Sequence, residues 1–197
     1  MKIKFQKINE RKFLLSSLQN KNVVSIMKRS FDKDIDDLSD EWKIYSQPNL
    51  LKDIVKECYS VIGKNWDKYD YLVALGNNAT PLAYSLGLYY NKKVLFVDDE
   101  WGVTCFFQAI KPSNIDLDNK KLLIVLPYFE SGLKASRGID VLNERARNLH
   151  VDVLTVVFFP EYLDEEIFRK NNYKDCLLYY LFSWDEKIKK QILQKID

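Results

Sequence analysis

The sequence is poor in the residues from which most catalytic metal sites and disulfide frameworks are built. Among 197 residues it has one histidine, His150, and three cysteines, Cys58, Cys105 and Cys176. A single histidine cannot supply the histidine-rich ligand sets of catalytic zinc, and three cysteines far apart in sequence form neither a disulfide framework nor a CxxC metal motif. We therefore expect reduced, buried cysteines, and we interpret His150 as the residue that begins a strand.

The chain also lacks a strong net charge and long hydrophobic runs. Its 30 Lys and Arg and 28 Asp and Glu leave a formal charge of +2, which gives no long-range reason to bind nucleic acid or anionic lipid. No apolar run approaches the roughly 18 residues that a membrane span needs, and residues 1–12 carry no signal-peptide core. With 47% hydrophobic residues, the composition predicts a packed, soluble cytoplasmic protein.

Short apolar runs alternate with helical patterns from residue 69 onward. Runs at 71–75, 93–97, 122–126 and 153–159 indicate buried strands, and we expect Pro127 to end the third because proline cannot donate to a sheet ladder. Helical spacing follows the first and third runs, which is typical of a parallel sheet with right-handed crossovers. Ligands lie outside the carboxyl ends of such strands, so the segments of interest are 76–80, 98–101 and 127–134.

The flanking segments are predicted in the same way. A helix capped by Asn49 and stopped at Gly63 precedes the sheet, residues 176–182 form a further strand, and a capping box at 183–186 begins a last helix. We expect a strand over 103–110, a helix around 11–18 and extended chain near 23–26. The predicted organisation is an N-terminal helix and hood-like segment over 1–48 and an α/β core over 49–197, together one domain.

The order of these elements resembles the orotate phosphoribosyltransferases, a branch of the type I phosphoribosyltransferase family. The resemblance runs from about residue 35 to the C-terminus and lies in element order, spacing and loop positions more than in identities. It is carried by YDYLVALGNNATPLAYSLGLYY, KVLFVDDEWG, KKLLIVLPYFESGLKASRGIDVLNERA, DVLTVVFF and YYLFSWDEKI. It implies a phosphoribosyltransferase-like parallel sheet flanked by helices, transfer of ribose phosphate from 5-phosphoribosyl diphosphate (PRPP) with Mg²⁺, and a homodimer.

The resemblance also assigns two loops of the binding site. In the family, the turn after the third strand binds the 5′-phosphate with backbone N–H groups at a helix N-terminus. Its counterpart here is Glu130, Ser131, Gly132, Leu133 and Lys134. The counterpart of the diphosphate loop is Gly76, Asn77, Asn78, Ala79 and Thr80. In this second loop the amide of Ala79 could face an anion, but an ordinary strand-to-helix connection capped by Thr80 explains it equally well.

This chain departs from the family pattern where two acidic residues would hold the ribose hydroxyls. Leu126 and Pro127 stand there and cannot accept hydrogen bonds. Glu130 places a negative charge beside the expected phosphate, at a cost on the order of 1–4 kcal/mol for a charge pair about 4 Å apart. Leu133 replaces a second glycine, and the covering segment 101–110 has no Lys or Arg. These departures argue against ordinary transfer from PRPP.

Three acidic residues, Asp98, Asp99 and Glu100, follow the second predicted strand. Asp98 and Asp99 are the catalytic candidates, and such carboxylates could also hold magnesium, although a solvated acidic turn is the commoner explanation. Nearby aromatic residues could stack on a base or pack against a partner chain. They are Trp101, Phe106, Phe107, Tyr128 and Phe129.

Three functions remain open at this point. The first is a phosphoribosyltransferase-like protein that has lost ordinary PRPP transfer and serves as a nucleotide- or sugar-phosphate-sensing or protein-binding module. The second is an active, Mg²⁺-dependent orotate-type transferase with an altered substrate, using Asp98 or Asp99 in place of the lost carboxylates. The third is a structural subunit of a larger assembly. The missing acidic pair favours the first, and no metal or cofactor is firmly implied.

Overall fold

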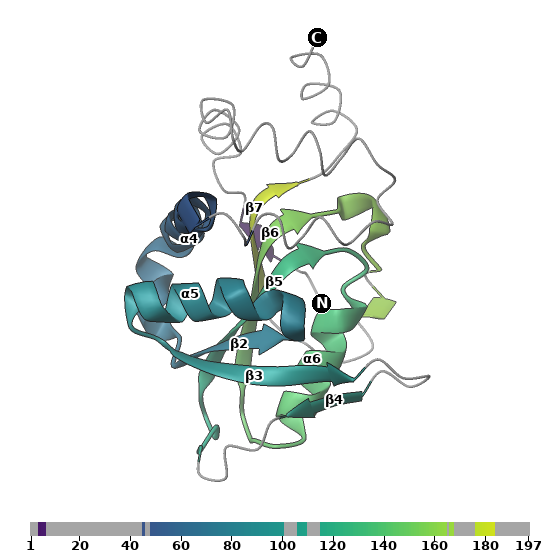
Figure 1. Cartoon of the computed structure of the whole chain (residues 1–197). Helices are drawn as coiled ribbons and strands as arrows, with labels where there is room; N and C mark the ends of the chain where they lie inside the picture. Colours follow the sequence, from purple (N-terminus) through teal and green to yellow (C-terminus); the bar gives the residue numbers. More distant parts are fainter. Residues whose placement is uncertain are drawn as a thin grey trace.

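A single sheet organises the part of the chain that the computed structural model describes, which is residues 4–6, 45, 48–100, 106–109, 115–164, 166–167 and 176–183. Its seven strands lie in the order β1-β7-β6-β5-β2-β3-β4 (Figure 1). The strands are β1 (Lys4–Gln6), β2 (Tyr71–Leu75), β3 (Lys93–Glu100), β4 (Phe106–Ala109), β5 (Lys121–Phe129), β6 (His150–Phe158) and β7 (Leu177–Ser183). Neighbouring strands are parallel except β3 and β4, which are antiparallel. The predicted parallel α/β sheet is therefore confirmed.

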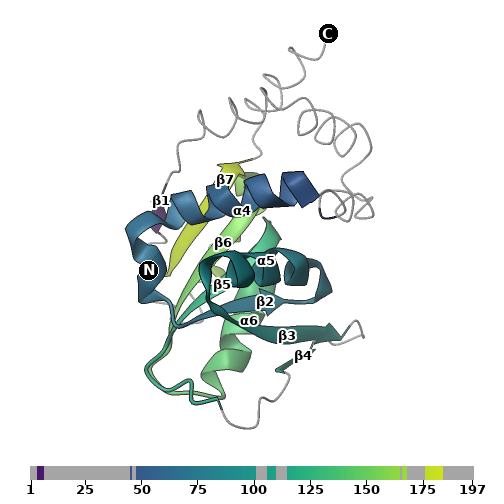
Figure 2. The same ribbon diagram turned by 60° about the vertical axis from the view of Figure 1, so that its left-hand side comes forward.

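Helices cover both faces of this sheet. They are α4 (Pro48–Ile62), α5 (Thr80–Tyr90) and α6 (Leu133–Asn143), joined by the 3₁₀ turns η2 (Gly63–Lys68), η3 (Asn77–Ala79) and η4 (Pro160–Tyr162). Figure 2 shows α4 and α5 on one side of the sheet and α6 on the other. Successive strand residues point to opposite faces, so Leu123 and Val125 pack against α4 and α5, whereas Leu122 and Ile124 pack against α6. This two-sided burial explains why the strands are almost continuously apolar.

The chain reverses its direction of winding between β2 and β5. From β2 it passes through α5 to β3 on one side, and from β5 through α6 to β6 and then β7 on the other. Because β2 and β5 are neighbours in the sheet, the connections leaving their carboxyl ends diverge. Ligands of open α/β sheets bind at such a switch point. It places residues 76–80 and 130–134, the two loops that the resemblance assigns, at the same edge of the sheet.

Two strands are longer than the sequence predicts. β3 continues beyond Val97 to Glu100, because its last residues pair with β4. The predicted acidic turn at 98–100 is therefore wrong, and these residues belong to a strand. β5 continues through Pro127 to Phe129. Val125 is the last residue of β5 that pairs with β2, and pairing with β6 passes from Leu126 to Tyr128, so Pro127 interrupts a ladder that has one side only.

Other predicted elements have mixed outcomes. The helix stopped at Gly63 is confirmed as α4, and Gly63 has a φ of 53°. The predicted cap at Asn49 is wrong, because the helix begins at Pro48 and Asn49 lies inside it. His150 begins β6, as predicted. Strand β1, which pairs with β7 at the edge of the sheet, was not foreseen. The expected helix at 11–18, the extended chain at 23–26 and the last helix after Ser183 lie outside the described residues, and the division at residue 48 stays a prediction. No helix in the described ranges has the length and apolar character of a membrane span.

Candidate functional site

The backbone of the loop after β2 is held by hydrogen bonds to β3 and within the loop. Gly76 has a φ of 75°, a region that only glycine adopts without strain, and its N–H donates to the carbonyl of Val97 at 2.8 Å. The backbone N–H of Ala79 donates to the carbonyl of Gly76 at 3.2 Å, and the Thr80 hydroxyl reaches the same carbonyl at 3.4 Å. The Ala79 amide is thus engaged within the turn rather than presented to an anion. Thr80 is the first residue of α5 and not its N-cap, which is Ala79.

The turn after β5 keeps a glycine-dependent path into a helix. Gly132 adopts a left-handed conformation with a φ of 83° and forms the N-cap of α6. Its carbonyl accepts the Ser136 N–H at 2.9 Å, while the Ser131 hydroxyl accepts the N–H of Leu133 at 3.3 Å. The Ser131 carbonyl also accepts the N–H of Asp164, which ties the turn to the segment after β6. The turn is therefore held in one shape from both sides.

One side-chain contact joins the two loops across the switch point. The Lys134 ammonium on α6 donates to the Asn78 side-chain oxygen at 3.3 Å, although the two residues are 56 positions apart in sequence. The sequence had singled out both residues through the resemblance, and the structure brings them together. A ligand between these loops would meet the positive charge of Lys134 and the polar group of Asn78.

The residues at the end of β5 belong to the hydrophobic core. Leu126 is 2% exposed and packs in the core beneath α6, and Pro127 is buried as well. Beyond them Phe129 is 3% exposed and meets Phe158 edge-on, with ring centroids 6.0 Å apart. The side chains of Leu126 and Pro127 offer no oxygen ligand to ribose hydroxyls or to Mg²⁺, which prefers carboxylates and phosphate oxygens. These two side chains therefore do not supply the carboxylates that the resemblance implies for magnesium-bound PRPP at this position.

Among the described residues of the segments at the carboxyl edge of the sheet, acidic residues outnumber basic ones. The described acidic residues in the segments at this edge are Asp98, Asp99, Glu100, Glu130, Glu161, Asp164 and Glu166. Against them stand Lys134 and Arg137, both on the first turns of α6.

The two catalytic candidates, Asp98 and Asp99, lie apart from residues 130–134, which we call the phosphate turn after their counterpart in the family. In the sheet β2 separates β3 from β5, so Asp98 and Asp99 are two strand spacings, or about 10 Å, from the end of β5. Their backbones pair with Gln108 and Phe107 of β4. They do not occupy the place of the missing acidic pair.

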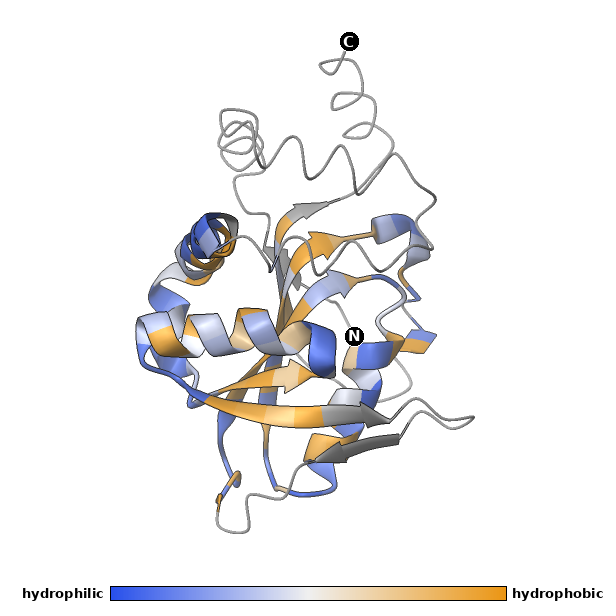
Figure 3. Cartoon of the chain, viewed as in Figure 1, coloured by the Kyte–Doolittle hydropathy of each residue, from blue (hydrophilic) through white to orange (hydrophobic). Residues whose placement is uncertain are grey.

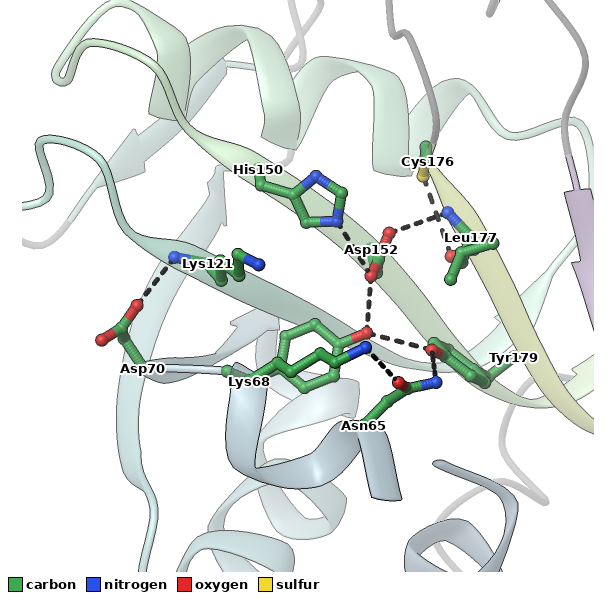
Figure 4. A network of polar contacts seen from close by, with 10 residues as sticks. Asn65, Lys68, Asp70, Lys121, His150, Asp152, Cys176, Leu177 and Tyr179 are labelled. Carbon is green, nitrogen blue, oxygen red and sulfur yellow. Dashed lines mark hydrogen bonds and ion pairs between the residues drawn. The ribbon is translucent and has the colours of Figure 1, made fainter. Parts of the chain in front are cut away.

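A buried polar network at the opposite, amino edge of the sheet was missed in the sequence (Figure 4). Asp152 is 3% exposed and accepts three hydrogen bonds, from the Tyr69 hydroxyl at 2.5 Å, the Leu177 N–H at 2.8 Å and the His150 Nε2 at 3.2 Å. Because a carboxylate only accepts, the imidazole must carry its proton on Nε2. The signal was present in the sequence, since an aspartate inside the apolar run at 150–159 points inward.

The network continues from Tyr69 to the surface. The Tyr69 and Tyr179 hydroxyls lie 3.2 Å apart, and the Asn65 side-chain amide donates to Tyr179 at 3.2 Å. Burial raises the pKa of Tyr69, and the charge of Asp152 raises it further, so this hydroxyl stays protonated. The pKa of Tyr179 is also raised by burial. These bonds connect η2, β6 and β7, and they lie at the far end of the strands from the candidate site.

The described cysteines have no reactive character. Cys58 and Cys176 are free and buried, and burial raises the pKa of both thiols, that of Cys176 to about 12. A thiol with a raised pKa is a poor nucleophile and a poor metal ligand at neutral pH. Within the described ranges, no three His, Cys, Asp or Glu side chains are arranged to hold a metal ion.

Comparison of the sequence with known families and with curated proteins finds no match. Solved structures do resemble this one. An orotate phosphoribosyltransferase from Aeropyrum pernix superposes with a TM-score of 0.61 at 17% identity, over 81% of each chain. An adenine phosphoribosyltransferase from Leishmania tarentolae gives a TM-score of 0.59 at 12% identity, over 77% of this chain and 76% of that one.

A third similar structure is a hypothetical protein from Neisseria gonorrhoeae with bound ppGpp. Its TM-score is 0.50 at 15% identity, over 71% of this chain and 82% of that one. At such identities the likeness concerns the fold alone. The strand order, the switch point between β2 and β5 and these structural matches agree that the chain has the type I phosphoribosyltransferase fold.

Proposed function

We propose that this protein has lost ribose-phosphate transfer from PRPP and binds a nucleotide or sugar phosphate between residues 76–80 and 130–134. The observation that carries the first half is the burial of Leu126 and Pro127 at the end of β5. Side chains that lie in the core and have no hydrogen-bonding group cannot take over the role of two carboxylates. The acidic residues described at the carboxyl edge of the sheet also argue against PRPP as a substrate, because they would repel its three phosphates.

The second half rests on what the site retains. Gly76 and Gly132 keep their positive φ values, so both loops follow paths that need glycine. Lys134 lies at the turn and reaches Asn78 across the switch point. One lysine and the nearby Arg137 can balance the charge of a single phosphate group, so the favoured ligand is a monophosphate. The Neisseria protein of the same fold, described with ppGpp bound, supports the view that this scaffold can hold a nucleotide.

Calorimetric titration with ribose 5-phosphate and with nucleoside monophosphates tests the binding. We expect measurable heat, and an affinity about 10-fold lower in the Lys134→Ala variant. Lys64→Ala is the matched control because Lys64 is exposed on η2, at the other edge of the sheet. Equal affinity in all three proteins, or no binding at millimolar ligand, would refute a phosphate site at this turn.

A separate assay tests the loss of transfer. Diphosphate release from PRPP is measured with Mg²⁺ in the presence of orotate, adenine or hypoxanthine, and we expect none above the uncatalysed rate. Release that disappears in the Asp98→Asn or Asp99→Asn variant would instead establish the active, Mg²⁺-dependent transferase. The separation of Asp98 and Asp99 from the end of β5 is a further reason why we favour a protein without transfer activity. We place the protein in the cytoplasm as part of the same proposal.

A further inference from the structure

The segment that follows β6 passes over the carboxyl end of the sheet from one face to the other. Phe159 is 4% exposed and belongs to the core cluster under α4 and α5, whereas Leu163, four residues later, packs against the cluster beneath α6. The 3₁₀ turn η4 lies between them, and its Tyr162 N–H donates to the Phe159 carbonyl at 3.2 Å. In Figure 3 the segment after β6 accordingly alternates between hydrophilic and hydrophobic stretches. We call residues 159–164 the crossing segment.

Two backbone hydrogen bonds join the crossing segment to the end of β5 and to the phosphate turn. The N–H of Phe159 donates to the carbonyl of Phe129 at 2.9 Å, and the N–H of Asp164 donates to the carbonyl of Ser131 at 3.2 Å. The two donors are the first and last residues of the crossing segment, and the two acceptors flank Glu130. The crossing segment therefore holds the beginning of the phosphate turn at two points.

The shape of the phosphate turn decides where the N–H groups at the start of α6 point. The first N–H groups of a helix have no acceptor within the helix, and they can bind an anion. Gly132, with a φ of 83°, and the Ser131 hydroxyl, which accepts the Leu133 N–H, set the path into α6 from within the turn. The Ser131 carbonyl is held from outside by Asp164. A ligand that binds to a turn already held in shape avoids the entropic cost of ordering it.

We propose that the crossing segment controls the phosphate affinity of this site, with the backbone N–H of Asp164 as the positioning group. The inference rests on the proposed function, because it concerns the same turn. While the segment is docked, the turn keeps the shape that receives a phosphate. When the segment is undocked, the Ser131 carbonyl loses its donor and the affinity falls. Because such coupling is reciprocal, bound phosphate must in turn favour the docked segment.

The Asp164→Pro variant tests this role because proline has no N–H to donate. Asp164→Ala is the matched control, since it removes the same carboxylate and its bond to the Glu166 N–H but keeps the donor to Ser131. Leu163 has a φ of −66° and a ψ of 119°, so the residue before position 164 already suits a proline. In calorimetric titration with inorganic phosphate, we expect an affinity about 10-fold lower in Asp164→Pro than in Asp164→Ala.

Two substitutions of Leu163 change the other anchor of the crossing segment. Leu163→Ser weakens the packing beneath α6 and should lower the phosphate affinity, whereas Leu163→Met conserves the apolar volume and should retain it. Circular dichroism verifies that each variant is folded. If Asp164→Pro is not, the comparison of Leu163→Ser with Leu163→Met decides, and equal affinities of these two variants would overturn the inference.

Hydrogen exchange supplies a readout that a merely structural role would not change. By the reciprocal coupling, saturating phosphate should slow exchange of the Asp164 amide in the wild type by about the same 10-fold factor. Equal phosphate affinities in Asp164→Pro and Asp164→Ala, or an exchange rate that phosphate leaves unchanged, would overturn this inference while the proposed function stood. A wild-type protein that does not bind phosphate would overturn both.

Discussion

Asp152 shows how a single buried charge can join three elements. Both of its oxygens accept hydrogen bonds, Oδ2 from Tyr69 and His150 and Oδ1 from the backbone of Leu177. Tyr69 precedes β2, whereas His150 and Leu177 begin β6 and β7. A buried carboxylate is tolerated only when it is compensated in this way, and removing it leaves the donors unpaired. Asp152 is therefore expected to stabilise the amino edge of the sheet.

The Asp152→Ala variant should lower the free energy of unfolding by about 2–4 kcal/mol, because the Tyr69 hydroxyl and the Leu177 N–H lose their acceptor. Asp152→Asn should recover at least half of that loss. The Tyr69 hydroxyl can turn and the His150 ring can carry its proton on the other nitrogen, so that both accept from the new side-chain amide instead of donating. Urea unfolding gives the two values, and Glu161→Gln, an exposed site, serves as the control expected within about 0.5 kcal/mol of wild type. A cost below 1 kcal/mol for the alanine variant would show that water replaces the carboxylate.

Single residues also mark what could and could not be read from the sequence. The place of His150 at a strand start follows from local pattern, because apolar runs are a local property, whereas the assignment of Lys134 to a phosphate turn comes from the resemblance. The engagement of the Ala79 amide by Gly76 does not follow from local pattern, because the same residues also suit an open loop. The bonds of Asp152 join residues up to 83 positions apart, and long-range pairing leaves no local trace beyond an unexpected charge in an apolar run.

At the scale of elements, the sequence predicts the interiors of strands better than their ends. The runs at 71–75 and 122–126 are strands because both faces of the sheet are covered, which local apolar content reports directly. The ends of β3 and β5 depend on neighbours. β3 is extended by β4, and β5 passes through Pro127 where pairing with β2 has ended. Neither fact can be recovered from the residues of the strand itself.

The close packing of helix α5 against β3 can be tested by substituting Gly87. A Cβ on Gly87 would lie 2.5 Å from a Val94 methyl group and 2.8 Å from the Lys92 carbonyl oxygen. Gly87→Ala should therefore destabilise by about 1–3 kcal/mol, the reverse of the gain of roughly 1 kcal/mol that alanine brings to an ordinary helix interior.

Gly138→Ala on α6 is the comparison for that variant. The three atoms nearest to its Cβ would all belong to the Leu75 side chain, the first at 2.6 Å, and a side chain can move where backbone cannot. Thermal unfolding should rank Gly87→Ala as the more destabilised of the two. The opposite order would mean that α5 can shift away from β3 at little cost.

For the whole molecule, the hydrophobic core extends along β5 to the carboxyl edge of the sheet. Apolar side chains run along β5 to Phe129, and the segment after β6 closes against it through the N–H of Phe159, which donates to the Phe129 carbonyl at 2.9 Å. A carboxylate returned to Leu126 would be buried beneath α6 without a partner, at a cost of several kcal/mol. The scaffold is retained because its parallel strands need the same helices whatever the loops bind. Under the proposed loss of transfer, we therefore expect that exchanging residues 126 and 127 alone does not produce transfer activity.

The phosphate turn, in contrast, is at the surface and can be changed without disturbing that core. Glu130 is exposed and Leu133 is 41% exposed, so Glu130→Thr combined with Leu133→Gly removes a charge and a side chain that pack little. Relief of one repulsive contact with phosphate should strengthen binding of inorganic phosphate about 10-fold in a calorimetric titration.

Glu144→Thr removes the same charge beyond the other end of α6 and should leave the affinity unchanged. An equal gain in both variants would assign the effect to net charge, and no gain in the double variant would mean that the turn does not form a phosphate cradle. Diphosphate release from PRPP should stay absent throughout, because Leu126 and Pro127 remain in place.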